Sequence, residues 1–207
     1  MADSLYKSNM NTDFGKKLEF LVTLDKMKGV YRQTLLTDKS RRETDAEHSW
    51  HIAMMAMLFS DLAPEGVDRD RCIRMCLVHD LVEIYAGDTF CFDQKGHEDK
   101  EEREKQAADK LFSILPKKDG EELRHLWTEF EAQETPDAKF CASLDRIQPL
   151  VNNILTDGHT WRKGKVNRAQ VEKRASVIEH GFPNAWQTVC DVIDEAEEIG
   201  YFKHEKN

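Results

Sequence analysis

Apolar side chains recur at helical spacing along almost the whole chain, and no segment keeps the strict alternation of a half-buried strand. The first stripe runs from Phe14 to Leu24, and Gly29 supplies a residue that can end that helix. Further helices are predicted from near Asp45, from Asp68 or Asp70 to Gly87, from Glu121 to Gln133, from Pro136 to about Thr156, from about Asn167 to Glu179 and from about Asn184 to Ile199. We therefore expect an all-α fold, a single bundle of helices.

Local signals support several of these helices. Thr44 and Glu47 have the spacing of a capping box, and Thr135 precedes a proline at a first helical position. The charged run from His97 to Lys110 is expected to form a solvated helix face. Loops are expected from Arg32 to Arg42 and from Gly158 to Gly164. Expected to be buried or half-buried are Ile73, Cys76, Leu77, Leu81, Ile84, Trp50, Trp127, Trp161 and Trp186.

The composition predicts a folded globular protein and favours a small ligand over a nucleic acid. The chain has 207 residues, of which 40% are hydrophobic and 33% charged, so it is too apolar to be disordered. We expect one domain over residues 1–207, with its core from about 14 to 201 and with polar termini that fray. The net charge of −9 disfavours a nucleic-acid partner, because it offers little to a phosphate backbone.

The expected location is the cytoplasm. The longest strongly apolar run, Ile52 to Phe59, is far shorter than the roughly 20 residues that cross a bilayer, so no membrane contact is expected. The first residues are polar and lack the apolar region of an export signal. The cysteines form no C-x-x-C pair, and they are expected to be reduced and mostly buried.

Acidic and imidazole side chains stand where apolar packing is expected. His79 and Asp80 lie in an apolar segment, and a buried carboxylate needs a basic side chain or a metal ion beside it. No Lys or Arg lies between residues 75 and 91, which favours a divalent metal. His48 and Asp145, on two other apolar helices, are candidates for the third and fourth ligands. Two imidazoles and two carboxylates suit one ion of Mn, Co, Fe, Mg or Zn.

Each of these residues also has a simpler interpretation. A single helical histidine is more often a hydrogen-bonded core or surface residue than a metal ligand. His51 could bind the same metal as His48, but the H-E-x-x-H pattern of zinc proteases is absent, so it is expected behind the ligands or in packing. Glu83 follows His79 by four residues, so on a helix both project to nearly one side. Glu83 is either a surface glutamate or a carboxylate that takes a proton from water and gives one to a leaving oxygen during hydrolysis.

Three segments occur in order along the chain, from Ala46 to Ser49, from Val78 to Asp88 and from Leu144 to Arg146. They contain the pattern H…HD…D, with E-x-x-x-G-D behind the His-Asp pair. On these motifs the chain resembles the HD-domain metal-dependent phosphohydrolases, in particular their 5′-deoxynucleotidase-like branch. The resemblance runs from about residue 14 to residue 201.

The resemblance implies roles for individual residues. The residues that it implies as ligands of one divalent metal are His48, His79, Asp80 and Asp145. It implies that Glu83 is the catalytic carboxylate. It also implies that Asp88 binds the sugar of a nucleoside and is needed for activity, with Thr89 beside it in the pocket.

The same resemblance places an arginine and its neighbour at the substrate. Arg32 is implied to orient the phosphate, a role that also suits a planar guanidinium on chemical grounds. Gln33 stands where the deoxynucleotidase branch tends to have an aromatic residue, which leaves the identity of the substrate open. Arg41 and Arg42 follow in a longer loop, where they either add phosphate contacts or are only solvated.

The function expected from these residues is removal of phosphate from a (deoxy)nucleoside 5′-monophosphate or a similar phosphate monoester. One alternative is hydrolysis of another phosphoester, such as a deoxynucleoside triphosphate, a cyclic nucleotide or a nonnucleotide phosphate. The other alternative is a regulatory module that binds metal and nucleotide without turnover. The resemblance also implies a homodimer.

Overall fold

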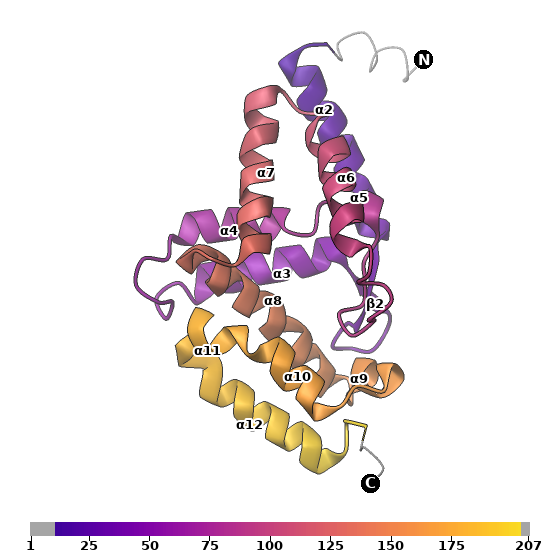
Figure 1. Cartoon of the computed structure of the whole chain (residues 1–207), viewed down its shortest axis with the longest axis vertical. Coiled ribbons are helices and arrows are strands. Elements are labelled where there is room, and N and C mark those ends of the chain that lie inside the picture. Colours follow the sequence, from indigo (N-terminus) through magenta and orange to yellow (C-terminus); the bar gives the residue numbers. More distant parts are fainter. Residues whose placement is uncertain (1–10, 204–207) are drawn as a thin grey trace.

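The computed structural model describes residues 11–203, and within them it confirms the expected all-α fold (Figure 1). The elements in chain order are α2 (Asp13–Leu24), the 3₁₀ turn η1 (Asp25–Gly29), β1 (Tyr31–Leu35), β2 (Arg42–Thr44), α3 (Asp45–Leu58), α4 (Arg69–Val78), α5 (Glu83–Ala86), α6 (Lys100–Phe112), α7 (Lys117–Ala132), α8 (Pro136–Leu155), α9 (His159–Gly164), α10 (Arg168–Ala175), α11 (Val177–Gly181) and α12 (Pro183–Ile199). The predicted fraying of the termini concerns mainly residues 1–10 and 204–207, which lie outside the described residues.

Helix α8 is the central element of the bundle. Its start follows the predicted cap, because the Thr135 side chain accepts a hydrogen bond from the Ala138 N–H and a proline opens the helix. It contacts α3, α4, α7 and α11, and Figure 1 shows it running between the α3–α4 layer and the α10–α12 layer. Phe140 and Leu144 are completely buried there. A polar side chain on the buried face of α8 therefore lies in the interior and needs a partner.

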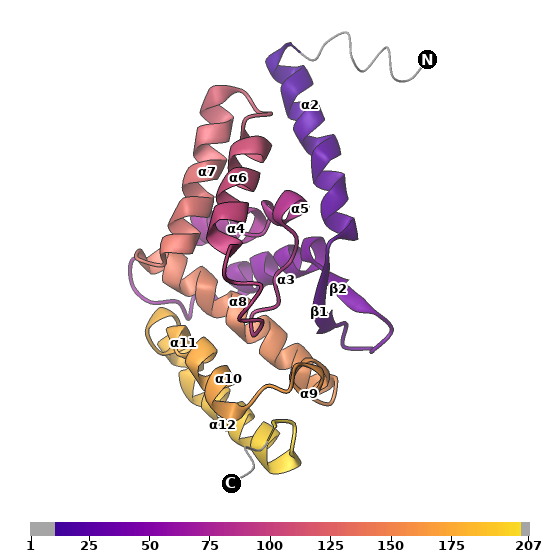
Figure 2. The ribbon, with the colours of Figure 1, turned by 45° about the vertical axis from the view of Figure 1, so that its right-hand side comes forward.

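A short hairpin replaces the first predicted loop. Strands β1 and β2 pair antiparallel, with Tyr31 opposite Thr44 and Leu35 opposite Arg42 (Figure 2). The pairing is irregular between its two ends, so the period-2 pattern on which a strand prediction depends is lost. The hairpin matters for function because it carries Arg32 to the side of α3 and α8.

The helix predicted to reach Gly87 is interrupted. α4 ends at Val78, a turn follows, and the short α5 begins at Glu83, so His79 and Asp80 lie in a turn instead of inside a helix. No glycine or proline marks this break in the sequence. Gly87 does end α5, with the positive φ of 78° that favours glycine.

Other boundaries also differ from the prediction. Residues 159–164 form α9 instead of a loop, α7 begins four residues earlier than expected, and the helix predicted from Asn167 is divided near Ser176 into α10 and α11. Leu77 and Trp50 were expected to be buried or half-buried but are 45% and 61% exposed. The apolar stripe of α2 is likewise exposed, with Phe14 at 75%. Periodicity identified these faces as apolar without showing whether anything covers them.

The remaining observations concern cysteines and membranes. All five cysteines are free, and Cys72, Cys76 and Cys141 are buried, as expected. No helix in the described part of the chain combines the length and the apolar character needed to cross a membrane.

Candidate functional site

The predicted metal ligands come from three places in the fold. His48 lies in α3, just behind the capping box that starts this helix. His79 and Asp80 occupy the turn after α4, and Asp145 lies midway along α8. His48 is fully buried, and His79 and Asp145 are nearly so. Contacts of α3 with α4 and α8 bring the three places together.

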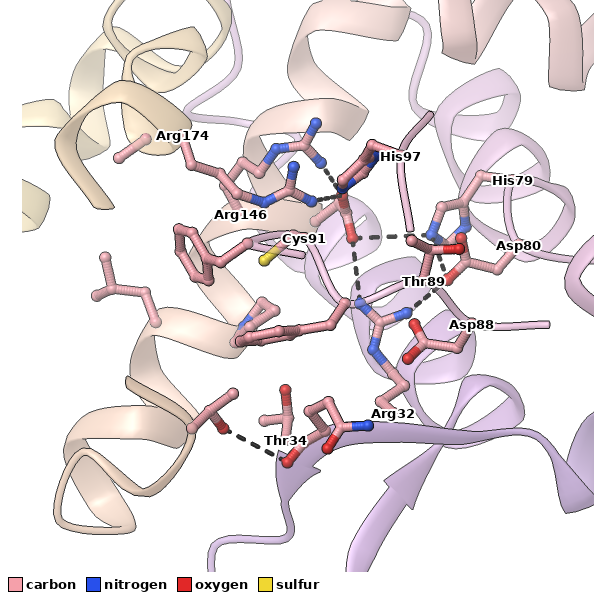
Figure 3. Close-up of a pocket in the computed structure, with 18 of the residues that line it drawn as sticks. Arg32, Thr34, His79, Asp80, Asp88, Thr89, Cys91, His97, Arg146 and Arg174 are labelled. Atoms are coloured by element: carbon pink, nitrogen blue, oxygen red, sulfur yellow. Dashed lines mark hydrogen bonds and ion pairs between the residues drawn. The ribbon is translucent and has the colours of Figure 1, made fainter. Parts of the chain in front are cut away.

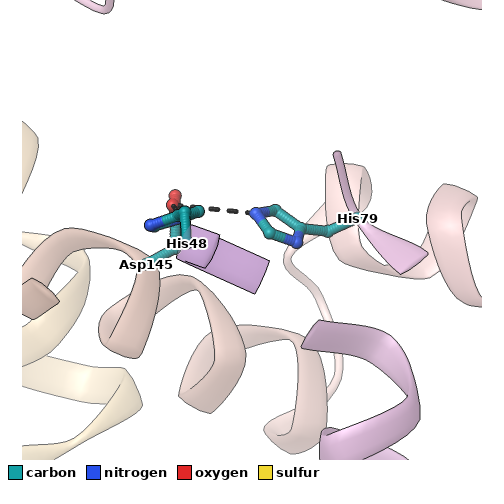
Figure 4. A group of neighbouring side chains, drawn as sticks. All are labelled: His48, His79 and Asp145. Carbon is teal, nitrogen blue, oxygen red and sulfur yellow. Dashed lines mark hydrogen bonds and ion pairs between the residues drawn. The ribbon is translucent and has the colours of Figure 1, made fainter. Parts of the chain in front are cut away.

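The ligand atoms of these residues converge (Figure 4). His48 Nε2 is 2.9 Å from Asp145 Oδ1, and His79 Nε2 is 3.8 Å from the same oxygen. Asp80 Oδ2 lies 3.0 Å from His79 Nε2 and 3.9 Å from His48 Nε2. Ligand atoms of His48, His79 and Asp145 all lie within 4.8 Å of one another, so this group can hold a metal ion.

Both imidazole rings are held in the orientation that a metal needs. His48 Nδ1 is 2.9 Å from Gln148 Oε1, and His79 Nδ1 is 2.8 Å from the carbonyl oxygen of Cys76. Each acceptor fixes the proton on Nδ1, which leaves the lone pair on Nε2 facing the cluster. Burial, followed by the charge of Arg32, lowers the pKa of His48 well below its usual range, so this ring stays neutral. The donor set therefore fits a borderline or hard divalent ion.

Arg32 supplies the basic side chain that the sequence around Asp80 lacks. Its Nη1 is 2.8 Å from Asp80 Oδ2 and 3.4 Å from Asp45 Oδ1, and its Nη2 is 3.9 Å from Asp145 Oδ1. Burial acts to lower the pKa of Arg32, but Asp80 and Asp45 outweigh it and raise the pKa. The guanidinium thus lies at the rim of the candidate metal site with its charge partly balanced.

Glu83 belongs to a second acidic group with Asp45 and Asp80, whose oxygens lie within 4.8 Å of one another. Burial, together with the charges of Asp80 and Asp45, raises the pKa of Glu83 well above its usual range. Its Oε2 has no hydrogen-bond partner among the described residues. A buried carboxyl group with a raised pKa binds a proton more readily than an exposed one, as a group that transfers protons must.

A cavity opens beside these groups, and Figure 3 shows its lining. Asp88 and Thr89 line it, as the sequence predicted, and so does Gln33, whose Oε1 accepts a hydrogen bond from Lys163 Nζ at 3.2 Å. Phe90 and Trp161 form an aromatic side of the cavity. Burial, opposed by Arg32, raises the pKa of Asp88.

Other residues singled out in the sequence lie elsewhere. Arg41 forms a two-fold ion pair with Glu47, and within the described residues neither Arg41 nor Arg42 lines the cavity. His51 is exposed, with its Nδ1 3.4 Å from Gln148 Nε2, which agrees with a packing role.

The sequence did not reveal several residues of the site. Gln148 links His48 to Glu43, because its Nε2 donates to Glu43 Oε1 at 2.7 Å. Burial raises the pKa of both Glu43 and Asp45 to about 7. In the sequence, Asp45 looks like an ordinary acidic residue in the first turn of a helix, and Gln148 is a single polar residue among apolar ones. The apolar neighbours of Gln148 were the one signal that it is buried.

The class of protein is defined by this fold and by the order of the converging residues. The model of the family described as HD domain matches residues 24–186, so the chain belongs to the HD-domain family. The resemblance inferred from the sequence motifs is confirmed by this match.

Individual relatives agree with the family. The human 5′-deoxynucleotidase HDDC2 is 30% identical over 78% of this chain and 84% of the relative. The 5′-deoxynucleotidase HDDC2 of Xenopus laevis is 34% identical over 66% of this chain and 64% of the relative. The crystal structure of a predicted metal-dependent phosphohydrolase from Magnetospirillum magnetotacticum MS-1 is 49% identical, with a TM-score of 0.89 over 92% of this chain and 96% of that chain.

Proposed function

We propose that this chain is a metal-dependent phosphohydrolase that removes phosphate from a (deoxy)nucleoside 5′-monophosphate. The observation that carries the proposal is the convergence of His48, His79, Asp80 and Asp145. Of these, His79, Asp80 and Asp145 line one cavity together with Arg32 and Glu83. The names of the human and Xenopus relatives support the substrate class. The Magnetospirillum structure supports metal dependence.

The geometry supports a role for each of these residues. His48, His79, Asp80 and Asp145 would hold the ion, which when bound supplies a Lewis acid for water and phosphate. Arg32 offers two parallel N–H donors to the phosphate and offsets charge that develops in the transition state. Glu83 accepts a proton from the attacking water and gives one to the departing 5′ oxygen. Burial and the charges of Asp80 and Asp45 raise its pKa, which makes its carboxylate a stronger base.

The nucleoside is assigned to the remaining walls of the cavity. Asp88 and Thr89 would contact the sugar, and Gln33 lies on the side of α9, where Lys163 holds its amide. Phe90 and Trp161 offer flat apolar surfaces to a base. Gln33 has a planar amide where the deoxynucleotidase branch tends to have an aromatic side chain. The preferred base must therefore be measured with a panel of nucleotides.

Phosphate release by the purified protein tests this function. The panel contains deoxynucleoside and ribonucleoside 5′-monophosphates, a deoxynucleoside triphosphate, a cyclic nucleotide and a sugar phosphate, each with several divalent ions. The Glu83→Gln variant should lose turnover by at least about 10²-fold while it keeps bound metal, and Asp145→Ala should lose metal. Normal activity in Glu83→Gln would remove this residue from the mechanism. No release from any compound would leave a binding module instead of an enzyme.

A homodimer is also proposed, through the apolar face of α2. Phe14, Leu21 and Val22 on this helix are 75%, 61% and 55% exposed, more than a monomer is expected to leave on one short helix. Sedimentation of the wild type and of Leu21→Glu tests this, since the charge should yield monomers. A monomeric wild type would rule the dimer out.

Two further expectations remain proposals. We propose a cytoplasmic location, which the free cysteines support because reducing compartments keep thiols unpaired. We also propose that the chain folds as one domain, with a core from about residue 14 to residue 201. Cell fractionation tests the first, and a single cooperative unfolding transition tests the second.

A further inference from the structure

The cavity has a basic extension that the proposed reaction does not use. We define the basic arm as the part lined by Arg146 of α8 and by Lys173 and Arg174 of α10, with walls from Phe92 and His97. Among the residues that the structure describes, no Asp or Glu lines this arm. In a chain with a net charge of −9, such a concentration of positive charge in a concave surface favours an anion.

The basic arm adjoins the candidate active site. Arg146, Arg174, Phe92 and His97 line both the arm and the main cavity. An anion in the arm would therefore lie next to the proposed substrate site.

The arginines of the arm have donors to spare. Arg146 Nη1 donates to Asp145 Oδ2, and Arg174 Nη2 lies 4.0 Å from the same oxygen (Figure 3). One carboxylate thus serves two guanidinium groups, and its other oxygen is already 2.9 Å from His48 Nε2. Each guanidinium has five N–H donors, so most of them remain for a ligand with several acceptor oxygens.

The spacing indicates what kind of ligand reaches both ends. Arg32 Nη2 is 3.9 Å from one oxygen of Asp145, and Arg174 Nη2 is 4.0 Å from the other, so these two nitrogens are on the order of 10 Å apart or less. Two phosphate groups on one sugar span such a distance. Residues 88–92 all line the main cavity, and residues 91 and 92 also line the arm, so the chain leads from the proposed sugar site into the arm.

We propose that the basic arm is a subsite for a second phosphate carried by the sugar, so that a deoxynucleoside 3′,5′-bisphosphate is a better substrate than the 5′-monophosphate. This proposal rests on the proposed function. In the reaction, water adds to the 5′ phosphorus, the bond from phosphorus to the 5′ oxygen breaks, and that oxygen gains a proton. Inorganic phosphate leaves and the 3′-phosphate stays on the sugar.

Kinetics with two nucleotides test the subsite. The KM of the wild type for deoxyadenosine 3′,5′-bisphosphate should be about tenfold lower than that for deoxyadenosine 5′-monophosphate, as expected for a charge-assisted pair of hydrogen bonds. In Arg174→Gln and in Lys173→Gln the ratio of the two KM values should fall toward one. Lys139→Gln, which removes an exposed charge of α8 outside the cavity, should keep the ratio. Equal KM values in the wild type, or a ratio that both arm variants retain, would overturn the proposal.

Binding separates this proposal from the proposed function. Calorimetry of both nucleotides and of inorganic phosphate is done with the metal-loaded Glu83→Gln protein, in which turnover should be absent. If the bisphosphate binds more tightly than the monophosphate, and if this difference depends on Arg174 and Lys173, the subsite is supported. This holds even if the wild type hydrolyses neither nucleotide, because absence of hydrolysis would refute only the enzyme assignment. Binding of inorganic phosphate with no advantage for the bisphosphate would overturn the subsite for substrate.

Discussion

Gln148 offers a selective test of the proposed metal centre, because it contacts the proposed ligand His48 and is not itself proposed as a ligand. Its Oε1 accepts from His48 Nδ1 at 2.9 Å, and its Nε2 donates to Glu43 Oε1 at 2.7 Å. Gln148→Leu removes both bonds and leaves the imidazole N–H and the Glu43 carboxylate without these partners in the interior. A buried group without a partner costs about 1–3 kcal/mol, so for two groups the free energy of unfolding of the metal-free protein should fall by about 2–6 kcal/mol.

The same substitution should weaken metal binding. Without Gln148, His48 loses the hydrogen bond that selects the tautomer with the lone pair of Nε2 directed toward Asp145 Oδ1. Loss of such an orienting partner typically reduces metal affinity by about 10–100-fold, or about 1.4–2.7 kcal/mol. Competitive titration with a metal indicator measures the affinity, and urea unfolding in a chelator measures the stability.

Asn152→Leu is the matched control. Asn152 is also a buried amide of α8, but its Nδ2 donates to the Leu35 carbonyl oxygen at 3.3 Å, away from the ligands. This variant should lose stability and keep the metal affinity of the wild type. If Gln148→Leu binds metal as tightly as the wild type, or if both variants lose affinity equally, the orienting role assigned to Gln148 is wrong.

Three further changes have outcomes that the structure fixes in sign. Gly181→Ala should lower the free energy of unfolding in urea by about 2–3 kcal/mol, because the new methyl group would overlap the Lys139 carbonyl oxygen. An unchanged urea midpoint would contradict this close packing of α11 on α8. Hydrogen bonds from Arg41 hold the pKa of Glu47 at about 2, below ~4.3 in an unfolded chain. The ionised Glu47 side chain therefore stabilises the folded protein above pH ~4, and this contribution disappears as the pH falls toward 2. The free energy of unfolding of Glu47→Gln should therefore be about 0.5–1 kcal/mol lower than that of the wild type at pH 7, a small value because the Arg41–Glu47 pair is exposed. Near pH 2 the two proteins should be equally stable. An equal deficit at both pH values would show that the charge of Glu47 is not the cause. Arg32→Lys should lower kcat for the 5′-monophosphate by about 10²-fold with metal affinity retained, since an ammonium lacks the two parallel donors, and a normal kcat would remove the phosphate role.

The parts of this molecule that depend on local pattern could be predicted from the sequence. The capping box before α3 and the Thr-Pro start of α8 are local signals, and both occur where expected. The β1–β2 pairing was missed because strands this short and irregular leave no period-2 signal. The end of α4 at Val78 was missed because no glycine or proline marks it in the sequence.

The candidate site divides in the same way. Motif order identified the ligand residues, whose roles remain proposals, while their mutual distances depend on packing between helices far apart in sequence. The pairing of Arg32 with Asp80 joins positions 48 residues apart, and that of Gln148 with Glu43 joins positions 105 apart. No single stretch of sequence contains such information, so the balance of charge around Asp80 became visible only in three dimensions.

The turn after α4 also bears on how two consecutive residues can face one candidate site. On an uninterrupted α-helix, neighbouring side chains diverge by about 100°. His79 still has helical φ and ψ, and its N–H donates to the Met75 carbonyl oxygen, whereas Leu81 and Glu83 donate to residues only three positions earlier. His79 Nε2 and Asp80 Oδ2 lie 3.0 Å apart at this change. The chain therefore begins its tighter turn directly behind the pair, and the two side chains reach one point from the end of α4.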